Sequence, residues 1–378
     1  MLLVYLRIAA SVLCTMWHAP GAQRWRRGAF GLAILTVVPI LLGINHAALA
    51  LDHIFYPGFR KFEIRRPLFI IGNLRTGSSY LYRLLARDRD TFACLRIVDF
   101  IFPSVIQKRV VRHLFRLDRR LGGHAYRLLK WADARLVSAY AHIHPTGLFV
   151  PEEDELILLN YLASAAVFES FPKVRRFRRF LYTDQEMDPP RSLRDMRRYR
   201  ELIRRHLYHV GGDRILLSKN PLFTCKIAAM QTVFPDARFL NLTRNPLQVV
   251  PSTAGLFHFV WRRSGALPPE GVDANWVLEL CDAYYRHPGP HLASLGDRAL
   301  TLRYDDLLTH TRHAVEMLLS RFGYPLTPAL DTAMDQEVAR ARGYRSQHRY
   351  SLDQWGLTVP QIVERYADVF EEHGFQRE

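Results

Sequence analysis

Two glycines and a set of hydrogen-bonding side chains form the strongest chemical motif in the chain. Gly72 and Gly77 bracket a short loop. Arg75, Thr76, Ser78 and Ser79, in the loop and at its exit, have side chains that can donate hydrogen bonds to an anion. Backbone N–H groups of such a loop, with the N-terminus of the following helix, make a site for a phosphate-like anion. The motif therefore predicts an anion-binding P-loop.

The loop departs from the P-loop of ATP-dependent enzymes at one position. Ser78 stands where the pattern G-x-x-x-x-G-K-[ST] requires lysine. In kinases and ATPases of that type, the lysine reaches the β- and γ-phosphates and an acid helps to hold magnesium. Here Arg75 is the loop's only cation. This favours an anion other than Mg-ATP, with a P-loop kinase and a ligand-free glycine turn as the alternatives.

Two more basic residues follow predicted strands. Lys219 comes after the apolar residues 214–218, and Arg244 comes after residues 237–243. Ser252 lies two turns into a helix that begins after Arg244, so both side chains can face one phosphate. Ligands of open α/β sheets bind at the carboxyl ends of the strands. We therefore expect Arg75, Lys219 and Arg244 to meet at one edge of the sheet.

The elements that position these residues alternate between strands and helices. Residues 68–71 are continuously apolar, as in a parallel strand covered on both faces, and residues 80–86 have a helical apolar face. Residues 91–97 and 299–304 also have strand patterns. This alternation predicts an α/β fold, a P-loop-containing parallel sheet with helices on both faces.

Several side chains are candidates for the general base of such a site. Asp99 follows the predicted strand 91–97, although it can equally be a carboxylate in the first turn of a helix. Residues 152–155 are all acidic and precede a predicted apolar helix over 156–166, so they either meet the helix dipole or supply a base, Glu153. His144 and His348 complete the candidates.

Composition indicates partners of opposite charge. The 378 residues are 49% hydrophobic and carry a net charge of +16, which favours nucleotides, nucleic acid or an anionic membrane. Arginines alternate with apolar residues in 104–140 and 173–180. Both segments fit anionic lipid, RNA or a solvated helix face, and we consider nucleic acid the less favoured partner. The four cysteines are widely spaced without a metal-binding pattern, which suits reduced thiols.

The N-terminal region is apolar with basic flanks. Residues 2–17 contain one charge and residues 29–51 contain none, so the second run is long enough to span a bilayer. Three arrangements remain open: a crossing helix or hairpin, an interfacial anchor, and a helical cap on the soluble domain. We expect residues 1–66 to be a membrane-anchoring region, with the rest of the chain facing the cytoplasm.

The motifs together resemble those of the sulfotransferase superfamily, specifically its bacterial membrane-associated branch. The matching blocks are residues 69–79, 219–221, 239–246 with Ser252, 303–307 and 348–352. The resemblance implies a sulfotransferase-like P-loop domain over 67–378 and the donor 3′-phosphoadenosine-5′-phosphosulfate (PAPS). It implies that the P-loop residues named above hold the 5′-phosphosulfate and that Arg244 and Ser252 hold the 3′-phosphate. His348 and Arg349 of the last block are also assigned to the donor.

The resemblance further implies the catalytic roles. Arg75 and Lys219 would stabilise the bridging oxygen as the sulfuryl group leaves, and no metal is required. Asp99 stands nearest to the glutamate that often serves as base in this family. The expected reaction is in-line sulfuryl transfer to a hydroxyl or amine of a lipid-like or amphipathic small molecule. A non-catalytic membrane adaptor is the alternative outside enzymes, and the acceptor and oligomeric state remain open.

Overall fold

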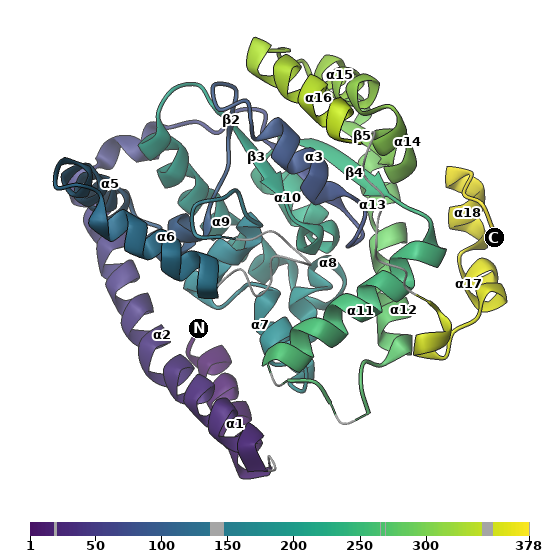
Figure 1. Ribbon diagram of the computed structural model, residues 1–378, viewed down its shortest axis with the longest axis horizontal. Coiled ribbons are helices and arrows are strands. Elements are labelled where there is room, and N and C mark those ends of the chain that lie inside the picture. Colours follow the sequence, from purple (N-terminus) through teal and green to yellow (C-terminus); the bar gives the residue numbers. More distant parts are fainter. Residues whose placement is uncertain (19–20, 137–146, 265, 269, 342–350, 378) are drawn as a thin grey trace.

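A five-stranded parallel sheet forms the centre of the protein (Figure 1). The computed structural model describes residues 1–18, 21–136, 147–264, 266–268, 270–341 and 351–377. The strand order is β2-β3-β1-β4-β5. The strands are β1 (Leu68–Gly72), β2 (Phe92–Ala93), β3 (Ile215–Lys219), β4 (Arg238–Thr243) and β5 (Ala299–Arg303). The predicted α/β fold is confirmed.

The continuous apolar run of β1 is explained by helices on both faces of the sheet. Leu68 and Ile70 pack into a cluster with α3 (Ser78–Leu85), α15 (Thr311–Phe322) and α16 (Pro328–Ala341). Phe69 and Ile71 face the opposite cluster. That cluster includes residues of α9 (Pro189–Val210), α10 (Ile227–Val233), α11 (Pro246–Ser264) and α12 (Ala274–Arg286). Successive side chains of a strand point to opposite faces, so both faces must be apolar.

The remaining elements connect and flank this core. They are α4 (Ile97–Ile101), α5 (Val105–Arg120), α6 (His124–Leu136), η3 (Asp154–Tyr161), α7 (Ala166–Ser170), η4 (Arg175–Phe180), α8 (Thr183–Glu186), η5 (Pro221–Lys226), α13 (Pro288–Ala293), η6 (Gly296–Arg298), α14 (Tyr304–Thr309), η7 (Asp353–Trp355), α17 (Val359–Arg365) and α18 (Ala367–His373).

Two predicted elements differ from the structure. The strand expected over 91–97 is only β2, because the chain turns into α4 from Ile97. The α-helix expected over 156–166 is the 3₁₀ helix η3, and Leu162 follows it with a φ of 50°. The residues that open η3 are buried. Tertiary contacts of its acidic side chains, described below, therefore outweigh the apolar pattern.

Two N-terminal helices lie along one side of the molecule (Figure 1). Helix α1 (Leu2–His18) packs on the long helix α2 (Gly21–Phe55), and Tyr5 donates to the carbonyl of Leu35 at 2.6 Å. A Cβ at Gly31 would stand 2.2 Å from Val12, so close packing requires glycine there. Among the described residues, Ile34–Phe55 is the helix long and apolar enough to cross a membrane.

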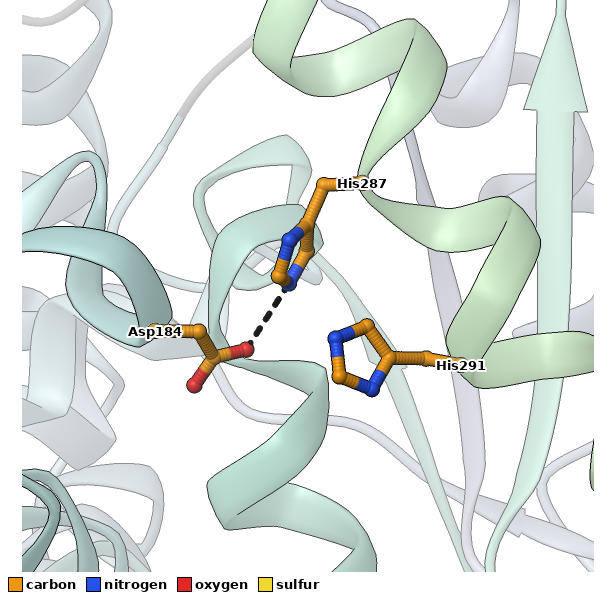
Figure 2. A group of neighbouring side chains, drawn as sticks. All are labelled: Asp184, His287 and His291. Atoms are coloured by element: carbon orange, nitrogen blue, oxygen red, sulfur yellow. Dashed lines mark hydrogen bonds and ion pairs between the residues drawn. The ribbon is translucent and has the colours of Figure 1, made fainter.

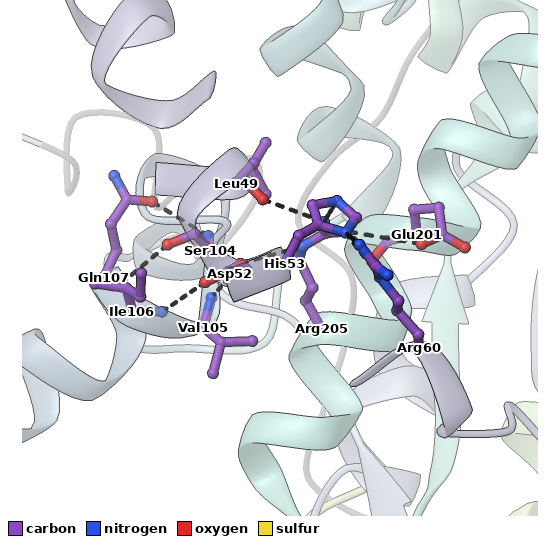
Figure 3. Close-up of polar contacts among 10 residues, drawn as sticks. All are labelled: Leu49, Asp52, His53, Arg60, Ser104, Val105, Ile106, Gln107, Glu201 and Arg205. Atoms are coloured by element: carbon purple, nitrogen blue, oxygen red, sulfur yellow. Dashed lines mark hydrogen bonds and ion pairs between the residues drawn. The ribbon is translucent and has the colours of Figure 1, made fainter. Parts of the chain in front are cut away.

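The C-terminal half of α2 is fixed to the sheet domain by buried polar contacts (Figure 3). Asp52 accepts hydrogen bonds from Val105 N (2.9 Å) and Ile106 N (3.0 Å) at the start of α5. It also pairs with Arg205 of α9, at 3.1 Å from Nε. Asn45 donates to the Asn160 side chain at 2.8 Å. These contacts join the C-terminal half of α2 to α5, α9 and η3.

Candidate active site

The two loop glycines adopt conformations that other residues rarely reach. Gly72 has a φ of 118°, and a Cβ there would meet the Leu242 carbonyl oxygen at 2.2 Å. Gly77 has a φ of 78°, and its Cβ would stand 2.5 Å from the Tyr304 ring. Both positions require glycine because the φ and the available space exclude a side chain. The loop is therefore held tightly against β4 and α14.

The loop is also fixed by hydroxyl groups. Thr76 donates to the carbonyl of Asn73 at 2.8 Å. The Gly72 N–H donates to Thr224 Oγ1, and Thr224 Oγ1 donates to the Gly72 carbonyl, both at 2.9 Å. Ser78 and Ser79 open α3, with Ser78 buried and Ser79 partly exposed. Their backbone N–H groups belong to the first turn of a helix, where an anion is stabilised.

The structure brings Arg75, Arg244 and Ser252 together. Arg75 Nε donates to Ser252 Oγ at 3.0 Å, and Arg244 Nη1 donates to the Arg75 carbonyl at 2.8 Å. The Arg244 guanidinium lies 4.1 Å from the centroid of the Tyr304 ring. Two guanidinium groups thus lie at the junction of the P-loop and α11. Such a concentration of positive charge requires anions for compensation.

Lys219 stands at the carboxyl end of β3, beside the P-loop strand. Its side chain is almost fully buried and pairs with Glu153 at 2.5 Å, while Glu153 keeps a quarter of its side chain exposed. The neighbouring Asn220 N–H donates to the Ile70 carbonyl at 3.1 Å, which locks this strand end to β1. The buried Lys219 ammonium and the partly exposed Glu153 carboxylate therefore lie at the same edge of the sheet.

Polar atoms without partners also mark this edge. Asn73 Oδ1, Asn220 Nδ2 and Thr243 Oγ1 are buried and have no hydrogen-bond partner among the described residues. They follow or end β1, β3 and β4, the three central strands. Because an unpaired buried polar atom costs about 1–3 kcal/mol, such atoms at a binding edge favour a polar ligand there.

Asp99 lies in a different environment. It is in the first turn of α4, where it accepts from Arg96 N at 3.1 Å, and it pairs with Lys108 at 2.6 Å and with His206 at 3.4 Å. Burial alone would raise the pKa of Asp99, but Lys108 and His206 outweigh it and hold the pKa well below its usual value. Its placement matches the helix-turn alternative. The carboxylate is an ion-pair partner, poorly suited to accept a proton.

Asp99 and Lys108 line a cavity of about 640 Å³. Its other walls are basic and aromatic, and include Arg112, Phe115 and His209. The cavity lies at α4, α5 and α6, and Arg96 on its wall bridges to Pro151, two residues before Glu153. The cavity therefore lies beside the segment that carries Glu153.

In the acidic run 152–155, buried side chains make tertiary contacts on either side of one partly exposed member, Glu153. Asp154 accepts from Tyr199 and, at 2.8 Å, from Ser218, and Glu155 pairs with Lys226. Burial raises the pKa of Asp154 to about 6. The helix-dipole interpretation does not account for these contacts, because the side chains turn into the core. No sequence feature distinguishes Glu153 from its neighbours, because residues 152–155 are all acidic.

Glu169 of α7 lies near this run and makes the fold sensitive to pH. Burial, with the charges of Glu153 and Glu155, raises its pKa from 4.5 to about 8. The folded state therefore binds the proton more tightly, so stability contributed by protonated Glu169 is present below pH 4.5 and lost as pH rises through 8. We expect Glu169→Gln to raise the free energy of unfolding at pH 8.5 by roughly 2–4 kcal/mol.

Urea denaturation at pH 5 and pH 8.5 measures this effect. The exposed Glu364 of α17 offers a matched control, Glu364→Gln, which should behave as the wild type at both pH values. Equal stability of Glu169→Gln and the wild type at pH 8.5 would contradict the assignment.

Three predicted site residues, His144, His348 and Arg349, lie outside the described residues. Their predicted roles stay predictions. The others are distributed over two places: the P-loop residues, Arg244, Ser252 and Lys219 at the carboxyl edge of the sheet, and Asp99 at the cavity by α5.

Comparisons with known proteins agree on one family. The family model described as the sulfotransferase family matches residues 67–328. The omega-hydroxy-beta-dihydromenaquinone-9 sulfotransferases Stf3 of Mycobacterium bovis and Mycobacterium tuberculosis are each 26% identical over 328 residues, covering 82% of this chain and 76% of theirs. Sulfotransferase STF9 from Mycobacterium avium has a similar fold, with a TM-score of 0.73 at 18% identity, covering 97% of this chain and 90% of that chain. Sulfotransferase STF1 from Mycobacterium tuberculosis H37Rv gives 0.67 at 20% identity, covering 96% and 92%.

Proposed function

Because this chain belongs to the sulfotransferase family, we propose that it transfers a sulfuryl group from PAPS to a hydroxyl group, or an amine, of a lipid-like acceptor. The main observation behind the proposal is the contact of the P-loop with a second cationic residue, Arg244. Arg75 in the loop bonds Ser252, and Arg244 bonds the loop backbone. A nucleotide with phosphate groups at both its 5′ and 3′ positions fits such a divided anion site.

In this proposal, residues at the carboxyl ends of β1 and β4 hold the donor. The N–H groups of the loop from Gly72 to Ser79 and the hydroxyls of Thr76, Ser78 and Ser79 surround the 5′-phosphosulfate. Arg244 and Ser252 bind the 3′-phosphate, and the Tyr304 ring supports the Arg244 guanidinium. His348 and Arg349 are proposed as further donor contacts.

The chemical step needs charge stabilisation and a proton acceptor. The acceptor oxygen attacks sulfur, and the bond between sulfur and the bridging oxygen of the 5′-phosphate breaks. Negative charge then develops on that oxygen, where Lys219 and Arg75 stabilise it. The hydroxyl proton passes to a carboxylate, and adenosine 3′,5′-bisphosphate leaves. None of these steps calls for a metal ion.

The geometry supports Glu153 as the base better than Asp99. Glu153 contacts Lys219 directly at 2.5 Å and remains partly open to an incoming acceptor. Asp99 is occupied by Lys108 and His206. A base must lie within hydrogen-bond reach of the reacting hydroxyl. When the donor binds, its phosphosulfate competes for Lys219 and releases the Glu153 carboxylate for the acceptor.

The proposed contact of Arg244 with the 3′-phosphate predicts that the protein discriminates between nucleotides with and without this phosphate. Wild-type protein should bind adenosine 3′,5′-bisphosphate more tightly than AMP, because only the former carries a 3′-phosphate. Arg244→Ala should reduce this preference by about 10- to 100-fold, the value of a lost charge-assisted hydrogen bond. Isothermal titration calorimetry measures both affinities.

The exposed Arg321 of α15 provides the control, because Arg321→Ala removes the same charge away from the site. Equal selectivity in Arg244→Ala and the wild type would contradict the 3′-phosphate assignment. Binding of Mg-ATP tighter than binding of adenosine 3′,5′-bisphosphate would instead support the kinase alternative.

The acceptor proposal rests on one relative and on the surface of the fold. The Stf3 proteins are named for a hydroxylated dihydromenaquinone, a lipid with a terminal hydroxyl. Here the cavity beside Glu153 has both apolar and basic walls. The described residues of helices α1 and α2 expose eleven large apolar side chains, which we call the N-terminal apolar surface: Leu2, Leu3, Leu6, Leu13, Leu32, Val37, Ile40, Ile44, Leu51, Ile54 and Phe55. An amphipathic lipid can reach such a cavity from a membrane surface.

The polar contacts of Asp52 (Figure 3) support one mode of membrane association over the others. Asp52 and Asn45 lie within the apolar stretch Ile34–Phe55, yet both are buried in polar contacts with the sheet domain. A crossing helix would have to break the Asp52–Arg205 pair and place Asp52 in hydrocarbon, which is strongly unfavourable. We therefore favour α1 and α2 as an interfacial hairpin on the cytoplasmic leaflet, with the arginines of α5 facing anionic lipid.

Vesicle binding tests this arrangement. The double variant Ile40→Glu/Ile44→Glu, in the N-terminal apolar surface, should weaken binding to vesicles containing phosphatidylglycerol. We expect about tenfold per buried side chain. Val359→Glu on α17, across the molecule, is the matched control because Val359 is also an exposed apolar residue (Figure 1). Unchanged binding of the double variant in sedimentation assays would refute the interfacial hairpin.

A further inference from the structure

A histidine pair and a buried aspartate side chain meet between α8 and the start of α13 (Figure 2). His287 precedes α13 with helical φ and ψ, and His291 is four residues on, so both rings lie on one face. Asp184 comes from α8, about 100 residues earlier in the chain. His287 Nε2 lies 2.9 Å from Asp184 Oδ2, and the ligand atoms of all three residues lie within 4.8 Å of one another.

We propose that Asp184, His287 and His291 bind a divalent transition-metal ion, with Zn²⁺ as the best fit. Two imidazoles and one carboxylate are a common zinc ligand set, and a water molecule would complete the tetrahedron. Zinc ligand atoms at about 2.0–2.1 Å from the ion stand roughly 3.3 Å apart. The His287–Asp184 separation already approaches that value, and a swing of the His291 ring closes the set.

The electrostatic setting favours a cation. The Asp184 and His287 side chains are only 5% and 10% exposed. The Asp184 carboxylate lies 2.9 Å from His287 Nε2, so an anionic ligand and an imidazole ligand already face each other. His291 is partly exposed, so it provides an entry path to the ion.

The neighbouring contacts can orient the ligands. Ala228 N donates to Asp184 Oδ2 at 3.0 Å, which fixes the carboxylate. The Gln185 side-chain amide lies 3.1 Å from His287 Nδ1. A 180° rotation of this amide places the Gln185 oxygen where it can accept from Nδ1–H. That arrangement leaves the lone pair of His287 Nε2 for the ion.

The proposed ion would link two elements that support the P-loop. Helix α8 packs on η5, and α13 packs on α10. Thr224 of η5 makes both side-chain hydrogen bonds to Gly72 of the loop. Bound metal would therefore stabilise the segment behind the P-loop without touching donor or acceptor. This role is independent of the proposed reaction.

Metal titration of the full-length, tag-free and chelator-treated protein tests the site. We expect one Zn²⁺ per chain in competition with a chromophoric chelator. We also expect a rise in melting temperature of about 3 °C at a free zinc concentration of 100 times Kd. Co²⁺ should give the visible absorption bands of a four- or five-coordinate site. Absence of these bands in the wild type, or several equal weak sites, would overturn the proposal.

Variants identify the ligands. His291→Gln and Asp184→Asn should each weaken zinc binding by roughly 10- to 100-fold or more and abolish the melting-temperature shift. The exposed His313 of α15 supplies the control, His313→Gln, which should bind zinc as the wild type does. Wild-type zinc affinity in both cluster variants would also overturn the assignment.

Discussion

Lys219→Ala should lower turnover by on the order of 10²–10³-fold, the effect of removing one preorganised donor to a developing oxyanion. Lys219 is almost fully buried at the end of β3, beside the P-loop strand, so its ammonium is held in place before the donor arrives. The effect should appear mainly in kcat, because charge on the bridging oxygen develops only in the transition state. Steady-state kinetics with saturating donor measure it.

Controls separate this effect from misfolding. Lys173→Ala removes a lysine that is exposed, so it should leave turnover unchanged. Lys219→Arg keeps the charge and should recover part of the lost rate. A loss of less than tenfold in correctly folded Lys219→Ala would contradict its role. A wild-type protein that binds donor yet transfers nothing would support the adaptor alternative.

Glu153→Gln should reduce turnover by about 10²–10⁴-fold, the range for a lost general base. The amide keeps the size of the side chain and can still accept a hydrogen bond from Lys219, but it cannot take the acceptor proton. The affinity for adenosine 3′,5′-bisphosphate should stay close to that of the wild type. Single-turnover transfer and calorimetry measure the two quantities on the same preparation.

Asp99→Asn is the matched comparison. It breaks the buried pair with Lys108, so it should lower the free energy of unfolding by roughly 3–5 kcal/mol. Turnover per folded molecule should change far less than in Glu153→Gln. The opposite pattern, with Asp99→Asn inactive and Glu153→Gln active, would assign the base to Asp99.

The P-loop and the cations were predictable because each rests on a local pattern. Apolar runs define the three central strands, and Arg75, Lys219 and Arg244 lie at or shortly after the carboxyl ends of those strands. Parallel strands deliver their carboxyl ends to one edge, so the meeting of such residues follows from topology. The contact of Arg75 with Ser252 is harder to predict from a local pattern, because it depends on the direction in which α11 leaves β4.

The setting of the carboxylates was not predictable from local patterns. Residues 91–97 are short and apolar, which does not distinguish a strand from a helix start. The sequence pattern therefore placed Asp99 after a strand end, whereas the structure places it in the first turn of α4. In the acidic run, the separate roles of Glu153, Asp154 and Glu155 depend on partners that are 9 to 71 residues away in sequence.

The docking of α2 on the sheet domain was not predictable for the same reason, because it depends on partners that are distant in sequence. Its apolar composition is typical of a span, whereas the side chains that fix it are single polar residues within that run. Asp52 finds its partner Arg205 across 153 residues of sequence. The cluster of Asp184 with His287 and His291 likewise joins distant segments, and only the i, i+4 histidine spacing is visible locally.

Transfer of labelled sulfur tests the central claim most directly. Purified wild-type protein is incubated with ³⁵S-labelled PAPS and a lipid extract, and the organic phase is separated by chromatography. We expect a discrete labelled lipid, formed together with stoichiometric adenosine 3′,5′-bisphosphate, and we expect this product to be lost in Lys219→Ala. Absence of labelled product from any lipid or polar acceptor pool, in a protein that binds the donor, would contradict it.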